Sequence, residues 1–279
     1  MTSIERLLDQ SLSADSLALP ETFQGFPGMA HGGSVLAAFD ALGRRRGAAG
    51  PREIFGHYRR KVPLNTPLRI EVLDSEGGID FRLSDETHRL VEGRVRPGAV
   101  PARGPEIPGD PSGGFPLPIS SSCFACGIKN FMGLQAALRF DDRRVWAEYV
   151  PREPFRTDDG RLSTAVLTTL LDEAAYWLGA LDTGESGMTT ELRVTLHRDA
   201  IGFGEPLIVI GERERVGQGA DDPRYRTTEP AILTANGELL ATGRITFVVI
   251  KGAAKRLVTG ILAVNPPEVL RRIFPGYVP

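Results

Sequence analysis

The sequence contains an internal repeat, and this repeat constrains the fold more than any other feature. Three segments of the first half have similar counterparts in the second half, in the same order. The spacing between partners drifts, as loops of unequal length would make it drift. Ordered self-similarity indicates two copies of one structural unit. The matched segments are 36–42 with 168–174, 58–72 with 197–209, and 90–95 with 240–245.

A stretch rich in proline and glycine separates the two copies. Residues 97–122 contain seven prolines and five glycines, a composition that sustains neither a helix nor a central strand. We therefore expect a first unit at residues 1–100, a linker at 101–120 and a second unit at 121–255. Residues 256–279 form a C-terminal tail to which the sequence assigns no role.

Both copies have the same predicted order of elements, a helix followed by extended segments. The second helix is apolar nearly all round, so we expect it to be enclosed rather than to lie on a surface. The predicted class is α+β, with two long helices, each wrapped by a curved antiparallel sheet, and with the two sheets continuous. The expected helices are 3–10, 32–46 and 163–181, with Ser163 as an N-cap, and the expected strands are 54–62, 68–74, 79–84, 89–96, 134–140, 145–149, 189–197, 207–215, 224–234 and 238–251.

Charge and composition exclude several functions. The chain has 33 basic and 35 acidic residues and a net charge of −2, so nothing draws the whole molecule to nucleic acid or to anionic lipid. The N-terminus lacks the apolar core of a signal peptide, and no apolar run is long enough to span a membrane. We expect a soluble cytoplasmic protein without nucleic-acid or membrane partners.

Two adjacent glycines open the first predicted helix. The sequence His31-Gly32-Gly33 places bare backbone N–H groups at a helix N-terminus, where they favour an anion or the oxyanion of a reacting carbonyl. A tight turn into the helix is the alternative explanation for the same glycines.

An aspartate recurs at the same place in both predicted helices. Asp40 follows His31 by nine residues, and Asp172 follows Ser163 by nine residues. A carboxylate among apolar neighbours is costly unless it is paired or functional. Glu173 lies beside Asp172 in sequence, but the two side chains leave a helix about 100° apart. The alternative is that these acids meet solvent or a polar partner.

These features together resemble the hotdog-fold acyl-CoA thioesterases, particularly the phenylacetate-pathway type. The resemblance rests on His31-Gly32-Gly33 with an acid nine residues later, and on Cys123-x-x-Cys126-Gly-x-x-Asn130-x-x-Gly-Leu before the second copy. It covers residues 20–97 and 120–250, and it is weakly specific for substrate. It implies a double hotdog, in which the two copies form an intramolecular pseudo-dimer. Association of further chains is left open.

The resemblance implies sites shared between the two copies. Helix geometry agrees, since Asp40 lies about 10 Å along its own helix from Gly33 and cannot reach a carbonyl held there. The first site would combine Gln24, His31, Gly32 and Gly33 with Asp172, aided by Glu173. The second would combine Ser163, Thr164 and Ala165 with Asp40, with Asn130 as a polar positioning group. Because Ser-Thr-Ala replaces His-Gly-Gly there, we expect one working site and one degenerate site.

The implied reaction is thioester hydrolysis. The N–H of Gly33 or Gly32 would bond the thioester oxygen, and Asp172 would activate water or attack directly. Gln24 or His31 would orient the reacting groups, unless His31 only bonds the backbone of the helix start. Tyr176 and Trp177 would line an acyl pocket or belong to the plain core.

Coenzyme A is expected only as part of the substrate, and no other cofactor is expected. Its phosphates would meet Arg59, Arg60 and Lys61, or Arg44 to Arg46, although both clusters are also typical of solvated surfaces. One Cys-x-x-Cys with four scattered histidines disfavours a zinc site, so no metal is expected, and a redox pair stays open.

Two other functions stay open. The same fold hosts dehydratases and hydratases that act on acyl thioesters, although no Asp-x-x-x-x-His motif surrounds the first helix. A non-catalytic acyl-CoA binder or sensor is the alternative outside enzymology, because fold does not fix function.

Overall fold

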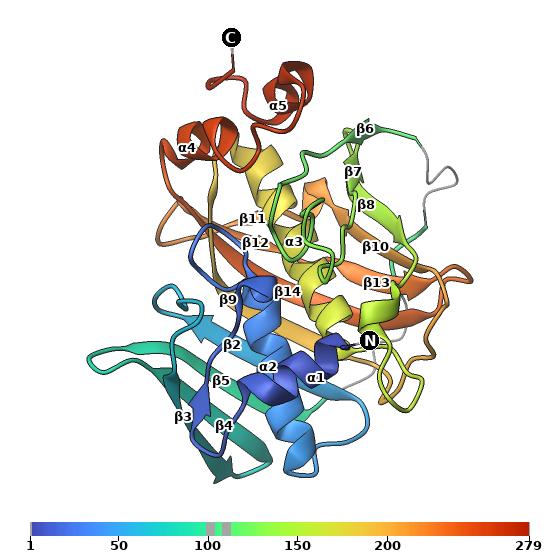
Figure 1. The fold of residues 1–279 in the computed structure, drawn as a ribbon. Coiled ribbons are helices and arrows are strands. Elements are labelled where there is room, and N and C mark those ends of the chain that lie inside the picture. Colours follow the sequence, from blue (N-terminus) through green and yellow to red (C-terminus); the bar gives the residue numbers. More distant parts are fainter. Residues whose placement is uncertain (1, 99–103, 108–112, 279) are drawn as a thin grey trace.

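One antiparallel sheet runs through the molecule, and two long helices pack against it (Figure 1). The computed structural model describes residues 2–98, 104–107 and 113–278. Helix α2 (Gly32–Arg45) contacts strands β2 (Arg52–Tyr58) and β5 (Arg89–Pro97). Helix α3 (Thr164–Thr183) contacts strands β9 (Gly187–Leu196), β10 (Leu207–Glu212) and β14 (Leu239–Val249). Among the described residues, no helix is both long and apolar enough to cross a membrane.

In each half of the chain a long helix is followed by a run of strands. The helices are α1 (Ile4–Ser11), α2 (Gly32–Arg45), α3 (Thr164–Thr183), α4 (Ala253–Thr259) and α5 (Pro267–Ile273), with 3₁₀ turns η1 (Glu21–Phe23), η2 (Glu153–Phe155) and η3 (Arg213–Arg215). The strands are β1 (Ser16–Leu17), β2 (Arg52–Tyr58), β3 (Leu68–Ser75), β4 (Gly78–Ser84), β5 (Arg89–Pro97), β6 (Phe115–Pro116), β7 (Arg139–Phe140), β8 (Arg144–Tyr149), β9 (Gly187–Leu196), β10 (Leu207–Glu212), β11 (Gly217–Gln218), β12 (Tyr225–Thr228), β13 (Ala231–Thr234) and β14 (Leu239–Val249).

The strand order explains how the two halves meet. It runs β1-β3-β4-β5-β2-β9-β14-β13-β10-β8-β7-β6, so strands of the first half occupy one side and strands of the second half the other. The seam is the antiparallel pair β2 and β9, in which Gly56 lies opposite Leu192. The sheet is therefore continuous, as the sequence predicts.

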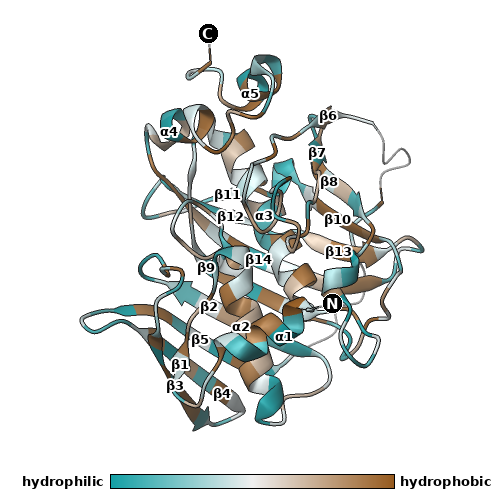
Figure 2. Cartoon of the chain, in the orientation of Figure 1, coloured by the Kyte–Doolittle hydropathy of each residue, from teal (hydrophilic) through white to brown (hydrophobic). Residues whose placement is uncertain are grey.

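Hydropathy explains which faces are buried. Almost the whole of α3 is buried. This is expected for a helix that carries few polar residues on any face, as its colouring by hydropathy shows (Figure 2). Strands such as β4 alternate between buried and more exposed residues, so one face packs on the helices and the other faces outward.

The helix boundaries agree closely with the prediction, and their caps explain why. Ser3 accepts from the Arg6 N–H and caps α1, and His31 occupies the N-cap position of α2 with its Nδ1 3.2 Å from the Gly33 nitrogen. Ser163 occupies the N-cap position of α3 but makes no side-chain capping bond. Gly184 ends α3 in the left-handed conformation, which favours glycine.

Several predicted strands are too long. The segment 224–234 is two strands, β12 and β13, separated at Pro230, which lacks an N–H for the ladder. Of 134–140 only β7 is a strand, because Leu134 and Ala136 instead donate to the carbonyls of Phe124 and Ala125. Strand β2 ends at Tyr58, and the expected strand 207–215 ends at Glu212, where η3 begins.

The predicted linker is described only in part. Residues 101–103 and 108–112 lie outside the described residues. Within the remainder, β6 pairs with β7 at the edge of the sheet, and the Leu117 N–H donates to the Leu138 carbonyl. The segment that begins at residue 113 is thus built into the second half.

The C-terminal residues pack onto the end of α3. The ring of Phe274 is fully buried, with its centroid 6.4 Å from that of Trp177. The Asn265 side chain exchanges two hydrogen bonds with the Ile119 backbone, at 2.9 and 2.6 Å. Helices α4 and α5 therefore cover one end of the second half (Figure 1).

Candidate active site

The start of α2 meets the middle of α3, and this contact forms the candidate site. Gly33 donates its N–H to Asp172 Oδ2 at 3.0 Å, and the Thr168 hydroxyl donates to the Gly33 carbonyl at 2.8 Å. Tyr58 on β2 donates its hydroxyl to the Gly32 carbonyl at 2.7 Å. Residues from both halves thus fix the first turn of α2.

The two glycines are required by this close approach. A Cβ on Gly33 would lie 2.6 Å from the Thr169 Cα and 2.7 Å from the Thr168 carbonyl oxygen, which are backbone atoms of α3. A Cβ on Gly32 would lie 2.7 Å from Asp172 Oδ2. Gly32 and Gly33 both have a negative φ, so their backbone conformation does not require glycine. Close packing against α3 explains why glycine stands at these two positions.

Asp172 is a buried carboxylate with donors on both oxygens. Thr189 on β9 donates to Oδ1 at 2.7 Å, while Oδ2 takes the Gly33 N–H and lies 3.2 Å from His31 Nδ1. Burial raises the pKa of Asp172 above its usual value, and the His31 charge, the Thr189 hydroxyl and the Gly33 N–H oppose that rise. The carboxylate is therefore held in one orientation, with a pKa above that of a free aspartate.

His31 bridges the two acids of α3. Its Nδ1 faces Asp172 Oδ2, and its Nε2 lies 3.6 Å from Glu173 Oε2. Burial alone would lower the pKa of His31, but the hydrogen bond to Glu173 and the charge of Asp172 raise it to about 9. Trp177 Nε1 donates to the other oxygen of Glu173 at 2.9 Å. The consecutive residues Asp172 and Glu173 thus contact opposite nitrogens of the His31 imidazole.

A mostly apolar cavity of about 270 Å³ opens beside these residues. Its wall contains His31, Gly32, Asp172 and Glu173, together with apolar side chains from both halves and from α4. Both Tyr176 and Trp177 contribute to it. The apolar residues of the wall include Phe26, Met29, Tyr176, Trp177, Val248 and Leu257.

Cys123 and Cys126 are free, buried and part of the same cavity wall. The Cys126 thiol donates a hydrogen bond to the Cys123 sulfur, which lowers the pKa of Cys123 and raises that of Cys126. The Ala125 N–H also donates to Cys123 Sγ, at 3.3 Å. The Cys-x-x-Cys loop therefore lies at the candidate site itself, which the sequence did not indicate.

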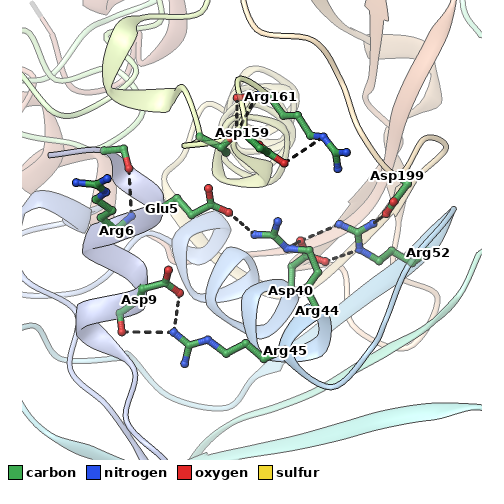
Figure 3. A network of polar contacts seen from close by, with 12 residues as sticks. Glu5, Arg6, Asp9, Asp40, Arg44, Arg45, Arg52, Asp159, Arg161 and Asp199 are labelled. Carbon is green, nitrogen blue, oxygen red and sulfur yellow. Dashed lines mark hydrogen bonds and ion pairs between the residues drawn. The ribbon is translucent and has the colours of Figure 1, made fainter. Parts of the chain in front are cut away.

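Asp40 lies elsewhere and has a different environment. Its buried carboxylate receives two hydrogen bonds from Arg52, at 2.6 and 3.0 Å, and Arg52 also contacts Asp199 (Figure 3). Among the residues that the structure describes, the wall of the cavity does not include the four members of the predicted second site: Asp40, Ser163, Thr164 and Ala165. The structure does not bring Asp40 to the residues around His31.

Gln24 and Asn130 hold the lead-in loop of the second half. Gln24 Nε2 donates to the Ser122 hydroxyl at 2.8 Å, and Asn130 Nδ2 donates to the Thr22 carbonyl at 2.8 Å. Neither belongs to the described cavity wall. Both side chains fasten residues 120–134 to the segment before α2, next to the site rather than in it.

The two basic clusters differ. Arg59, Arg60 and Lys61 line the cavity, and Arg59 is paired with Glu92 at 2.7 Å. Arg44 and Arg45 instead pair with Glu5 and Asp9 of α1, as Figure 3 shows. Only the cluster after β2 is therefore placed to meet a ligand in the cavity.

Sequence reasoning missed Thr189, Tyr58 and the placement of the cysteines. Thr189 and Tyr58 lie within or at the end of strands, where hydroxyl-bearing residues are common and give no signal. The contact between Glu173 and Trp177 could have been predicted from the sequence, because residues four apart share a helix face.

Comparison with known proteins identifies the fold. No family model matches the chain, and no curated protein matches it. A hot dog fold protein of unknown function from Alicyclobacillus acidocaldarius covers 87% of this chain and 97% of its own, with a TM-score of 0.60 and 14% identity. An acyl-CoA thioesterase II, TesB2, from Mycobacterium marinum covers 84% and 92%, with a TM-score of 0.58 and 15% identity.

A dehydratase is also similar. A variant of the GphF dehydratase covers 89% of this chain and 91% of its own, with a TM-score of 0.54 and 14% identity. At such low identities the likeness carries the fold and not the activity. The chain has an α+β hotdog fold.

Proposed function

We propose that the chain hydrolyses an acyl-CoA thioester to a free acid and coenzyme A at the cavity beside His31. The observation that carries this proposal is the meeting of the glycine-opened N-terminus of α2 with the buried carboxylate of Asp172 at one cavity wall. The likeness to a thioesterase of the same fold supports it.

The proposal includes a division of the chain into two fused hotdog units. The units are residues 1–100 and 121–255, joined by 101–120 and followed by the tail 256–279. It is supported by the seam at β2 and β9, where α2 packs mainly on strands of the first half and α3 on strands of the second half. The units then form a pseudo-dimer within one chain, and the site is composite because α2 and α3 both contribute to it.

Gly32 is the proposed donor to the thioester oxygen. Gly33 already donates to Asp172, whereas Gly32 lines the cavity and its N–H has no acceptor among the residues that the structure describes. A free N–H at a helix N-terminus stabilises negative charge that develops on a carbonyl oxygen. One such donor contributes about 3 kcal/mol to a transition state in other enzymes.

Asp172 is the proposed general base. Its raised pKa brings its proton affinity closer to that of a working base at neutral pH. Asp172 accepts a proton from water as the water oxygen attacks the thioester carbon. Collapse of the tetrahedral intermediate breaks the carbon–sulfur bond, and the same proton passes to the departing sulfur. His31 and Thr189 position the carboxylate for both steps.

The phosphates of coenzyme A are proposed to meet Arg60 and Lys61. Both side chains are exposed at the cavity, while Arg59 beside them is engaged by Glu92. An exposed basic pair at the mouth leaves the apolar interior to the acyl group and keeps the charged nucleotide in water.

Dehydration of a 3-hydroxyacyl thioester is the second candidate. The contact between His31 and Asp172 supplies an acid and a base in one apolar cavity, and a dehydratase has a similar fold. This route breaks a carbon–oxygen bond and leaves the thioester intact, so a single experiment separates the two.

The experiment is a thiol-release assay with short, medium, branched and aromatic acyl-CoAs, run beside 3-hydroxyacyl-CoA and 2-enoyl-CoA. Release of thiol from at least one substrate is the expected result. Interconversion of the hydroxyacyl and enoyl substrates without thiol release supports the dehydratase instead. Binding of acyl-CoA without either reaction means that the chain is a binder and overturns the proposal.

A further inference from the structure

Three side chains with different donor atoms converge on one side of the cavity. His31 precedes α2, Cys123 lies in the lead-in loop, and Glu173 belongs to α3. Their ligating atoms all lie within 4.8 Å of one another, and all three side chains are buried. Nitrogen, sulfur and carboxylate oxygen are the three kinds of ligand that Zn²⁺ takes in proteins.

The spacing fits a small metal ion. Ligands about 2.1 Å from a tetrahedral centre lie about 3.4 Å apart, and His31 Nε2 is 3.6 Å from Glu173 Oε2. The ligating atoms lie within 4.8 Å of one another, so the Cys123 sulfur has to move closer by at most about 1.2 Å to complete the site. A cysteine donor excludes Mg²⁺ and Ca²⁺, which prefer oxygen ligands, and favours ions of the zinc type.

Each of the three ligands already has an outer hydrogen-bond partner. His31 turns Nδ1 toward Asp172 Oδ2 at 3.2 Å and so leaves Nε2 for the ion. Trp177 Nε1 donates to Glu173 Oε1, which leaves Oε2 for the ion. The Ala125 N–H donates to Cys123 Sγ. Such partners orient the ligands of a metal and are part of a built site.

We propose that His31, Cys123 and Glu173 bind one divalent transition-metal ion of the zinc type. Cys126 is left out of the proposed site, because the clustered donor atoms belong to His31, Cys123 and Glu173. All three ligands line the cavity, so the fourth position of the ion faces the cavity, as in metal sites that bind a water or a substrate.

The test uses the full chain without an affinity tag, kept anaerobic with a non-thiol reductant. The protein is incubated with Zn²⁺ or Co²⁺ and desalted, and bound metal is measured by elemental analysis. We expect about one ion per chain, and a thiolate-to-cobalt charge-transfer band in the near ultraviolet. Retention of no ion by the wild-type chain would overturn the proposal.

Matched variants identify the ligands. Cys123→Ser is expected to abolish the charge-transfer band, and both it and Glu173→Gln to weaken metal binding at least 10-fold. Cys126→Ser is the control and is expected to keep both band and ion. If Cys126→Ser loses the ion as completely as Cys123→Ser, the ion is bound by the cysteine pair and the assigned ligands are wrong.

A measurement on the wild-type chain avoids any folding defect of the variants. Bound Zn²⁺ is expected to slow alkylation of Cys123 by iodoacetamide, read by peptide mapping, at least 10-fold. Equal alkylation with and without Zn²⁺ contradicts the site. Both readouts are independent of thioester turnover, so they stand or fall separately from the proposed hydrolysis.

Discussion

At the residue scale, His31 is the side chain on which the site depends. It occupies the N-cap position of α2, meets Asp172 through one ring nitrogen and faces Glu173 with the other. The sequence predicted that His31 and Asp172 lie together, and the structure places them 3.2 Å apart. The sequence did not indicate Cys123 as a neighbour, because the Cys-x-x-Cys pattern carries no signal of which distant residues it contacts.

Thr189 is expected to contribute to turnover by holding the Asp172 carboxylate in place. Thr189→Val removes the hydrogen bond to Asp172 Oδ1, and a bond to a charged group contributes about 1.5–3 kcal/mol. We expect kcat for thioester hydrolysis to fall roughly 10- to 100-fold, since 1.4 kcal/mol corresponds to about tenfold. Thr195→Val on the same strand is the control, and an equal fall in both variants would contradict a specific role.

Arg60 and Lys61 are expected to affect binding rather than turnover. Replacing both by glutamate puts negative charge where the phosphates of coenzyme A are proposed to lie, so KM should rise about 10-fold or more with kcat nearly unchanged. Arg45→Glu, in the cluster that pairs with α1, should leave KM unchanged. An unchanged KM in the double variant would remove these residues from the ligand site.

At the scale of elements, the contact between α2 and α3 defines the proposed active site. The sequence indicates either an oxyanion site or a turn at Gly32 and Gly33. The structure adds a third reason for Gly33, because the backbone of α3 lies where a side chain at this position would be. The repeated aspartates show how similar sequence takes different roles. Asp172 meets a threonine and the start of α2, whereas Asp40 meets an arginine.

Gly33→Ala tests the packing of the two helices. The added Cβ would meet α3 backbone at 2.6 Å, and such overpacking costs about 1–3 kcal/mol of the free energy of unfolding. We expect a lower midpoint in chemical denaturation and a loss of turnover, because α2 has to shift away from Asp172. Gly202→Ala, where a Cβ meets nothing within 4 Å, serves as the control. Unchanged stability in Gly33→Ala would show that the helices are farther apart.

The Asp40–Arg52 pair is expected to stabilise the fold without taking part in turnover. Arg52→Met leaves the fully buried Asp40 carboxylate without its main partner, which costs about 3–5 kcal/mol. The double variant Asp40→Leu with Arg52→Met should recover most of that loss, since no lone charge is then buried. Denaturant unfolding measures both. A loss below about 1 kcal/mol in the single variant would mean that the pair is not buried in solution.

At the scale of the whole molecule, the repeat predicts the arrangement better than it predicts the individual strands. Periodicity and caps located α2 and α3 within two residues, and order alone indicated antiparallel strands around them. Strand ends were missed at Pro230 and after Leu134, where local hydrogen bonds replace the ladder. The candidate site was predicted in part, because the glycines and acids lie in recognisable patterns. Thr189 and the cysteines reach it only through the folding of distant segments.

For the whole molecule, we propose that one composite site is active and that Asp40, the repeated aspartate of the first half, is structural. Comparing Asp172→Asn with Asp40→Asn in the thiol-release assay tests this claim most directly, with each variant shown to be folded and to bind acyl-CoA. We expect kcat to fall at least about 100-fold in Asp172→Asn, the usual loss for a general base, and to stay within about threefold in Asp40→Asn. Loss of turnover in Asp40→Asn with full turnover in Asp172→Asn would contradict it.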